Sequence, residues 1–228
     1  SLPRGEKIRI KDKSTYQKGI LELNKVRLYI MKTKRLKRFI YSFFVYSMAV
    51  QTIMLVAVYF GTKEVNWGEG ANAKMGLIIG VLLIQLIAIP GAILLSKISK
   101  FKGNLFALKL VVFIWILLCL SALLVYEPIH FYLISGFVGL VMGGIQSLSR
   151  STYSKYIPSG TKDTSSFFSF YDISEKLGIV IGMFSYGFIE QVTGSMRNSI
   201  VALVVFFIVG LLLLFQVPKE EISIESYG

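Results

Sequence analysis

The stretch FIYSFFVYSMAVQTIMLVAVYF, from Phe39 to Phe60, decides the class of fold. Its 22 residues include no charged side chain. Because a helix needs about 20 mostly apolar residues to cross about 30 Å of hydrocarbon, the stretch predicts a transmembrane helix. A cleavable signal peptide has an apolar region of only about 7 to 15 residues. The apolar run is longer than that and follows a 38-residue arm, so we do not expect it to be a signal peptide.

The composition of the whole chain agrees with a membrane protein. Of its 228 residues, 54% are hydrophobic and 17% are charged, and the mean hydropathy is +0.64. Soluble domains contain about 45 to 50% apolar and about 25% charged residues. We therefore predict an all-α integral membrane protein.

Five further stretches are long enough to span the bilayer, so residues 39–217 are predicted to form a bundle of six transmembrane helices. Three of these five carry no charged residue, and a fourth carries only Lys109, one turn inside its end. The remaining one carries Asp172, Glu175 and Lys176. The six predicted spans are 39–60, 75–95, 105–126, 131–149, 166–189 and 199–217.

The distribution of Lys and Arg predicts the orientation. The loops and ends on one side of the predicted bundle hold 20 of these residues, and the loops on the other side hold 3. Because loops rich in Lys and Arg stay in the cytoplasm, we expect both termini there, including a tail over residues 218–228.

Residues 1–38 form a basic arm, with 13 of the 25 Lys and Arg residues of the chain. No RNA-binding signature, glycine-rich phosphate loop or zinc-finger spacing accompanies it, so we expect it to meet anionic lipid and not nucleic acid. Residues 14–38 are predicted to form an amphipathic surface helix, while a helix and a solvated linker both stay open for residues 1–13. The apolar row of this helix is Tyr16, Ile20, Leu23, Val26 and Ile30.

The charged cluster of the fifth span is the main candidate for function. Asp172, Glu175 and Lys176 fall at i, i+3 and i+4, so they are predicted to share one helix face with Tyr171 beside them. A charge in the bilayer is costly unless it is paired or hydrated, and therefore such residues mark ion or substrate pathways. A structural ion pair between Asp172 and Lys176 is the alternative.

Three amides extend this candidate pathway. Lipid would leave the amides of Gln51, Gln85 and Gln146 without hydrogen bonds, so we expect all three to face the bundle interior. We include Gln51 and Gln146 in the pathway, although the same reasoning favours interhelical hydrogen bonding over solute contact for each of them.

Small residues predict close helix packing in the second and fourth spans. Glycines let two helices approach closely, and a Pro-Gly pair is predicted to kink or loosen the second span. The predicted packing residues are Gly136, Gly139, Gly143, Gly144, Pro90 and Gly91.

The single cysteine, Cys119, and the single histidine, His130, limit the chemistry of the chain. They exclude an internal disulfide and the zinc sites built from several Cys or His residues. His130 is predicted to lie far from Lys176, and no serine or aspartate pair accompanies it at a recognisable spacing. We expect no metal, no cofactor, no catalytic residues and no enzyme activity.

Five short motifs follow one another along the chain. They are YSMAVQT at 46–52, PGA at 90–92, GGIQSLSR at 143–150, FFSFY at 167–171, and the stretch from Gly187 to Ser195. In this order and spacing, residues 20–217 resemble a branch of the major facilitator superfamily, that of the fungal vacuolar amino-acid effluxer and its bacterial relatives. The six spans resemble the C-terminal half of such a transporter.

This resemblance implies half of a secondary active transporter that moves small polar metabolites, such as amino acids, by alternating access. Its partner would be an N-terminal six-helix half or a second copy of the chain, and the basic arm resembles the linker between halves. The implied location is a bacterial plasma membrane. A non-transporting six-helix scaffold or assembly subunit is the alternative, and six further spans encoded upstream would favour the transporter.

Two positions depart from the family pattern. Met48 and Ala49 stand where the resemblance implies an Asp-Gly pair, so proton coupling through that position is in doubt. Lys100 stands where an aspartate is usual in the loop after the second span, so the charge latch of that loop is absent or rewired.

Overall fold

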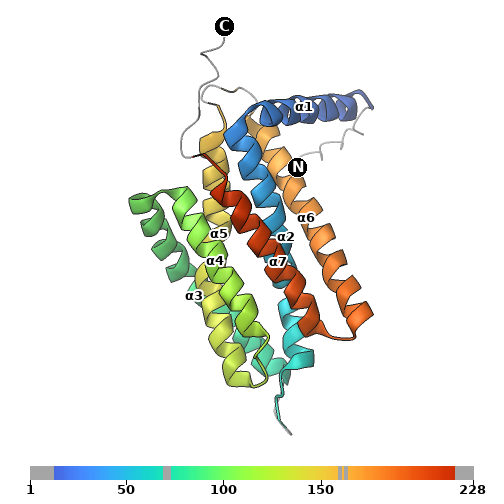
Figure 1. The fold of residues 1–228 in the computed structure, drawn as a ribbon, viewed down its shortest axis with the longest axis vertical. Coiled ribbons are helices and arrows are strands. Elements are labelled where there is room, and N and C mark those ends of the chain that lie inside the picture. The colour runs from blue at the N-terminus through green and yellow to red at the C-terminus, as the bar shows by residue number, and fades with distance from the viewer. Residues whose placement is uncertain (1–12, 69–72, 159–160, 162–163, 219–228) are drawn as a thin grey trace, which may run out of the picture.

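A computed structural model of the chain describes residues 13–68, 73–158, 161 and 164–218 (Figure 1). Within these residues it contains seven helices and no strand, which confirms the predicted all-α membrane fold. The expectations for residues 1–12 and 219–228, and for the side chains of residues 13–18, lie outside what is described. The helices are α1 (Lys13–Lys32), α2 (Lys34–Glu64), α3 (Ala73–Lys102), α4 (Asn104–Ala122), α5 (Pro128–Tyr156), α6 (Thr164–Thr193) and α7 (Met196–Phe215).

Helix α1 lies across one end of the bundle formed by α2–α7 (Figure 1). It buries Val26 and Ile30 there, and the ring of Tyr29 meets the edge of the Phe167 ring at 5.7 Å. The helix stops at Lys32, and Thr33 adopts an extended conformation that turns the chain into the membrane. The predicted surface helix over 14–38 is therefore shorter, because residues 34–38 form the first turns of α2.

Each predicted span overlaps one of the helices α2–α7, in chain order. Helices α2, α3, α5 and α6 have 29 to 31 residues, because backbone hydrogen bonding continues past the apolar window. Helix α4 instead ends at Ala122, and residues 123–126 form a turn. Helices α2–α5 and α7 are long and apolar enough to cross a membrane, whereas α6 carries the charged cluster.

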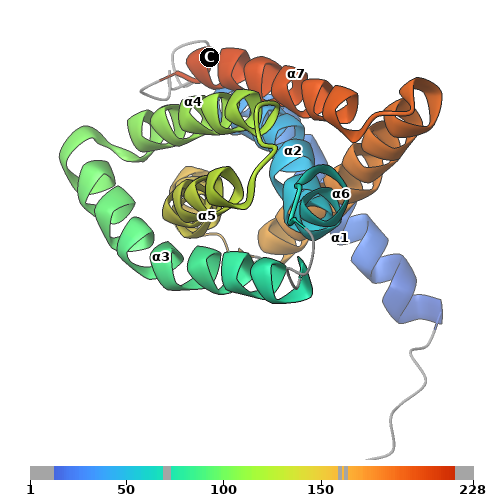
Figure 2. The ribbon, with the colours of Figure 1, turned by 90° about the horizontal axis from the view of Figure 1, so that it is seen from below.

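The six long helices form two groups of three. Helix α5 packs between α3 and α4, while α2 packs against α6 and α7, and the contact between α4 and α7 joins the groups (Figure 2). In chain order, α2 is the first of the first three long helices and α5 is the first of the last three. Each of these two helices packs with the other two members of the opposite set. This arrangement is consistent with the nested three-helix repeats of major facilitator halves.

The predicted packing glycines lie mainly in the contact between α3 and α5. A Cβ added at Gly139 would lie 2.6 Å from the carbonyl oxygen of Ile84, and one at Gly143 would lie 3.1 Å from that of Ala88. Gly91 meets the backbone of Leu140. Similarly, Gly136 faces Ile87 and Gly144 faces Leu95, while Pro90 lies exposed within a continuous α3.

Candidate functional site

A narrow recess lies between α2, α5 and α6, in the half of the bundle nearer to α1. It contains four of the predicted pathway residues, Gln51, Gln146, Tyr171 and Glu175. We call it the central recess. The other residues that line it are Phe43, Tyr46, Ser47, Val50, Ile145 and Ser149.

Glu175 is held by an amide from another helix. The Nε2 atom of Gln51, on α2, donates a hydrogen bond to Oε1 of Glu175, on α6. Both side chains are half-buried. A carboxylate with one fixed donor and partial access to water keeps free lone pairs for a proton or a ligand.

Asp172 pairs with a residue that the sequence reasoning did not select. Its Oδ1 atom lies 3.4 Å from Nη1 of Arg150, on α5, and the two side chains are 43% and 55% exposed. The guanidinium of Arg150 also lies over the rings of Phe168, at 5.1 Å, and Tyr171, at 5.9 Å. The charged pair therefore lies directly beside the recess, with Arg150 close to a ring that lines it.

Lys176 lies one turn from Asp172 on α6 and points away from α2. Gly178 is buried against α2, where an added Cβ would lie 3.1 Å from Oγ of Ser47. Two residues of an α-helix subtend about 200°, so Lys176 and Gly178 point in nearly opposite directions. Lys176 is exposed, and within the described residues it makes no hydrogen bond or ion pair. The alternative pair of Asp172 with Lys176 is therefore not formed.

Aromatic rings build the inner wall of the recess. The ring of Tyr171 stacks on that of Phe43 with centroids 4.1 Å apart. The hydroxyl of Tyr46 shares a 2.7 Å hydrogen bond with Oγ of Ser149, and all four side chains are buried. Tyr171 thus contributes a packed ring, which stiffens the contact between α2 and α6.

The three predicted amides differ in position. Gln51 is half-buried in the recess, whereas Gln146 lines it with an exposed side chain that donates to Sδ of Met54, at 3.3 Å. Gln85 is exposed on α3, so the expectation that all three face the interior is wrong for Gln85. The reason is that Gln85 occupies a helix face that the other described helices do not cover.

Two sequence signals were not used in the prediction. Arg150 follows Gln146 by four residues and so lies on the same face of α5. Gly178 and Gly182 are also four residues apart, the spacing of small residues at close helix contacts, and both pack against α2. Met48, which stands where the family pattern has the aspartate of an Asp-Gly pair, is buried in the same contact.

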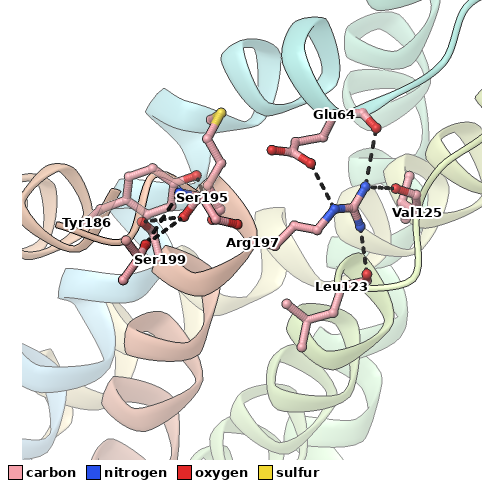
Figure 3. A network of polar contacts seen from close by, with 9 residues as sticks. Glu64, Leu123, Val125, Tyr186, Ser195, Arg197 and Ser199 are labelled. Carbon is pink, nitrogen blue, oxygen red and sulfur yellow. Dashed lines mark hydrogen bonds and ion pairs between the residues drawn. The ribbon is translucent and has the colours of Figure 1, made fainter. Parts of the chain in front are cut away.

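At the other end of the bundle, Arg197, at the start of α7, connects several helices through hydrogen bonds (Figure 3). Its Nε atom lies 2.8 Å from Oε2 of Glu64, at the end of α2. Its terminal nitrogens donate to the carbonyl oxygens of Leu123 and Val125, both at 2.6 Å. These bonds connect α7 to α2 and to the turn after α4. They also give hydrogen-bond donors to two carbonyl oxygens that follow the end of α4. The central recess therefore lies nearer to α1 than to the end of the bundle that the Arg197 network connects.

Among the described residues, no three His, Cys, Asp or Glu side chains gather in an arrangement that could hold a metal ion. The polar groups of the central recess and its surroundings are a carboxylate held by an amide and an exposed ion pair. Such groups can bind a charged or zwitterionic solute, or a proton.

Comparison with known proteins gives one consistent family. The family model described as vacuole effluxer Atg22 like matches residues 3–225. The uncharacterized MFS-type transporter YxiO of Bacillus subtilis is 28% identical over 192 residues, 84% of this chain and 43% of that protein. Autophagy-related protein 22 of Pichia angusta is 25% identical over 186 residues, 77% of this chain and 32% of that protein.

Autophagy-related protein 22 of Saccharomyces cerevisiae is also 25% identical, over 191 residues that make up 79% of this chain and 34% of that protein. The chain thus spans less than half the length of these curated relatives. No solved structure matches it.

Proposed function

Because the chain belongs to the family of vacuole effluxer Atg22-like proteins, we propose that it forms one half of a secondary active transporter. It moves small polar solutes, amino acids among them, by alternating access. The other half is a second six-helix bundle, either from the same protein or from another copy of this chain. Both termini face the cytoplasm of a bacterial cell, and the chain lies in the plasma membrane.

The observation that carries this proposal is the exposed ion pair of Arg150 and Asp172 beside the central recess. Charges within a membrane bundle are costly where lipid surrounds them, and so they occupy water-filled or protein-covered surfaces. The pair belongs to α5 and α6, on the same side of the bundle as the exposed amide of Gln146. We infer that this polar side faces the other half and, between the two halves, the solute.

The same pair supports the choice of an amino acid as solute. A guanidinium binds a carboxylate through two parallel hydrogen bonds, so Arg150 suits the carboxylate of an amino acid. Asp172 suits its ammonium group. Binding then exchanges one internal ion pair for two contacts with the zwitterion, and release restores the internal pair.

Glu175, Gln51 and Lys176 have separate roles in this proposal. Glu175 lies deeper than the ion pair, and its carboxylate keeps lone pairs free for an ion that accompanies the solute. Gln51 holds the carboxylate in place, and Tyr171 supports both groups. Lys176, which is exposed one turn from Asp172, contacts the other half and not the recess.

Solute flux tests the proposal. The protein expressed from its full reading frame is reconstituted in liposomes, and uptake of radiolabelled amino acids is measured for wild type, Arg150→Gln and Asp172→Asn. We expect each variant to lose at least about tenfold in flux, because each removes one charge-assisted contact with the solute. Glu127→Gln is the control, since Glu127 is exposed at the other end of the bundle. Unchanged flux in both variants would exclude the proposed site, and no uptake of any amino acid by wild type would favour the scaffold function.

A further inference from the structure

A second pocket lies at the end of the bundle near α1, where the turn between α3 and α4 faces α5 and the start of α2. Its lining contains five cationic side chains and no acidic one. We call it the basic pocket. The cationic residues are Arg35, Lys100, Lys102, Lys109 and Lys155.

A one-residue turn shapes this pocket. Gly103 alone separates α3 from α4, and its φ of +87° is a conformation that side chains with a Cβ rarely adopt. The tight turn keeps Lys100 and Lys102, at the end of α3, close to the start of α4. Two lysines are thereby fixed on one rim.

Hydrogen bonds hold the opposite rim. The Oδ1 atom of Asn104 accepts from Oγ of Ser99, at 2.6 Å, and from Nζ of Lys155, at 3.0 Å. Its Nδ2 atom donates to Oγ of Ser151, at 3.1 Å. One amide thus joins α3, α4 and α5. Because an amide carries no charge, it does not neutralise the lysines of the pocket lining.

Arg35 supplies a donor without an acceptor. Its guanidinium lies 4.2 Å from the ring of Tyr156, and its Nε atom is buried without a hydrogen bond to any of the described residues. Buried donors are almost always paired in folded proteins, so an orphaned donor in a cationic pocket indicates an acceptor that binds from outside. That acceptor is an anion, because a neutral group would not offset the neighbouring charges.

Apolar side chains beside the pocket indicate the source of the anion. Phe106 lines the pocket and is 44% exposed, and Phe101, between the two rim lysines in sequence, is 89% exposed. Large apolar groups next to cations at the end of membrane helices fit a headgroup and its acyl chains better than a free ion. We propose that the basic pocket binds the phosphate of an anionic phospholipid. This inference is independent of the proposed transport function, because no residue of the central recess lines the basic pocket.

Lipid binding to the purified protein tests the inference. Phosphatidylglycerol is titrated into detergent-solubilised protein, and bound lipid is counted by native mass spectrometry, with phosphatidylcholine as the neutral comparison. The variant Lys100→Gln/Lys102→Gln/Lys155→Gln should bind phosphatidylglycerol on the order of 100-fold more weakly, since each cation near a lipid surface contributes roughly one kcal/mol. Equal affinity of wild type and variant would overturn the proposal.

A matched control removes the same charge elsewhere. Lys63→Gln/Lys74→Gln/Lys97→Gln changes three exposed lysines that do not line the pocket, so its affinity should stay close to wild type. An equal loss in this variant would show that net charge and not the pocket binds lipid. If the first triple variant does not fold, Lys102→Gln and Lys97→Gln form the same comparison with single changes.

Soluble phosphates distinguish the two sources of the anion. Inorganic phosphate and glycerol 3-phosphate are added at concentrations up to about a hundred times the lipid dissociation constant. Failure of both to displace phosphatidylglycerol supports a lipid site that uses headgroup and chains together. Displacement of phosphatidylglycerol by either compound within this range would overturn the lipid as occupant and assign the pocket to a soluble phosphate compound.

Discussion

Asp172 on α6 forms its ion pair with Arg150 on α5, at 3.4 Å, although Lys176 lies one turn further along the helix of Asp172. The contact between α5 and α6 thus gives Asp172 a partner outside the charged cluster that the helix period predicts. Asp172 joins an interhelical pair, Glu175 accepts a hydrogen bond from Gln51, and Lys176 stays exposed without pairing with Asp172.

The exposure of this pair predicts how little stability it provides. Arg150 and Asp172 remain in contact with solvent or with a ligand, so Arg150→Gln and Asp172→Asn should each lower the free energy of unfolding by no more than about 1 kcal/mol. Unfolding by sodium dodecyl sulfate in mixed micelles measures this. A loss of about 3 to 5 kcal/mol in each single variant, recovered in the double variant, would show that the pair is structural.

The contact between α2 and α6 should be sensitive to side-chain volume at one glycine. A Cβ at Gly182 would lie 2.5 Å from the carbonyl oxygen of Met48, while one at Gly187, on the same helix, has nothing within 4 Å. We expect Gly182→Leu to destabilise the protein by at least about 1 to 3 kcal/mol and to reduce the folded yield in detergent. Gly187→Leu should retain the wild-type yield, and equal yields would contradict this packing.

The network around Arg197 should stabilise the end of the bundle opposite to α1. Arg197→Gln removes the charge partner of Glu64 and leaves the carbonyl oxygens of Leu123 and Val125 without a charged donor. Because charge-assisted hydrogen bonds contribute about 1.5 to 3 kcal/mol each, we expect a clear fall in the temperature of thermal unfolding.

Lys63→Gln is the control for that change, since Lys63 is exposed next to Glu64 in sequence and forms no part of the network. The double variant Arg197→Gln/Glu64→Gln should recover part of the loss, because it removes the unpaired carboxylate. A thermal unfolding temperature equal to that of wild type in Arg197→Gln would contradict a stabilising role.

Labelling from outside the cell tests the proposed orientation. Cysteine replaces Glu127 or Lys102, two exposed residues at opposite ends of the bundle, in a Cys119→Ser background. An impermeant thiol reagent should label the protein with cysteine at position 127 in intact cells. It should label the protein with cysteine at position 102 only after the membrane is broken, and the reverse pattern would show the opposite topology.

The sequence by itself determined the class of fold and the order of its long helices. Hydropathy is a local property, because the bilayer requires about 20 consecutive apolar residues whatever their neighbours are. The cluster of Asp172, Glu175 and Lys176 was equally visible, since charges stand out in an apolar span. Likewise, the glycines of the fourth span indicated close packing because small side chains are the only means of bringing two helix backbones together.

Only the tertiary structure decided which of these residues meet. The partner of Asp172 is 22 residues away in sequence, on a helix whose rotation depends on the packing of Gly139 against Ile84 and on the other contacts between α3 and α5. The same rotation leaves Gln146 exposed. Helix period fixes which side chains share a face, but the direction of that face follows from contacts between helices, which no local pattern encodes.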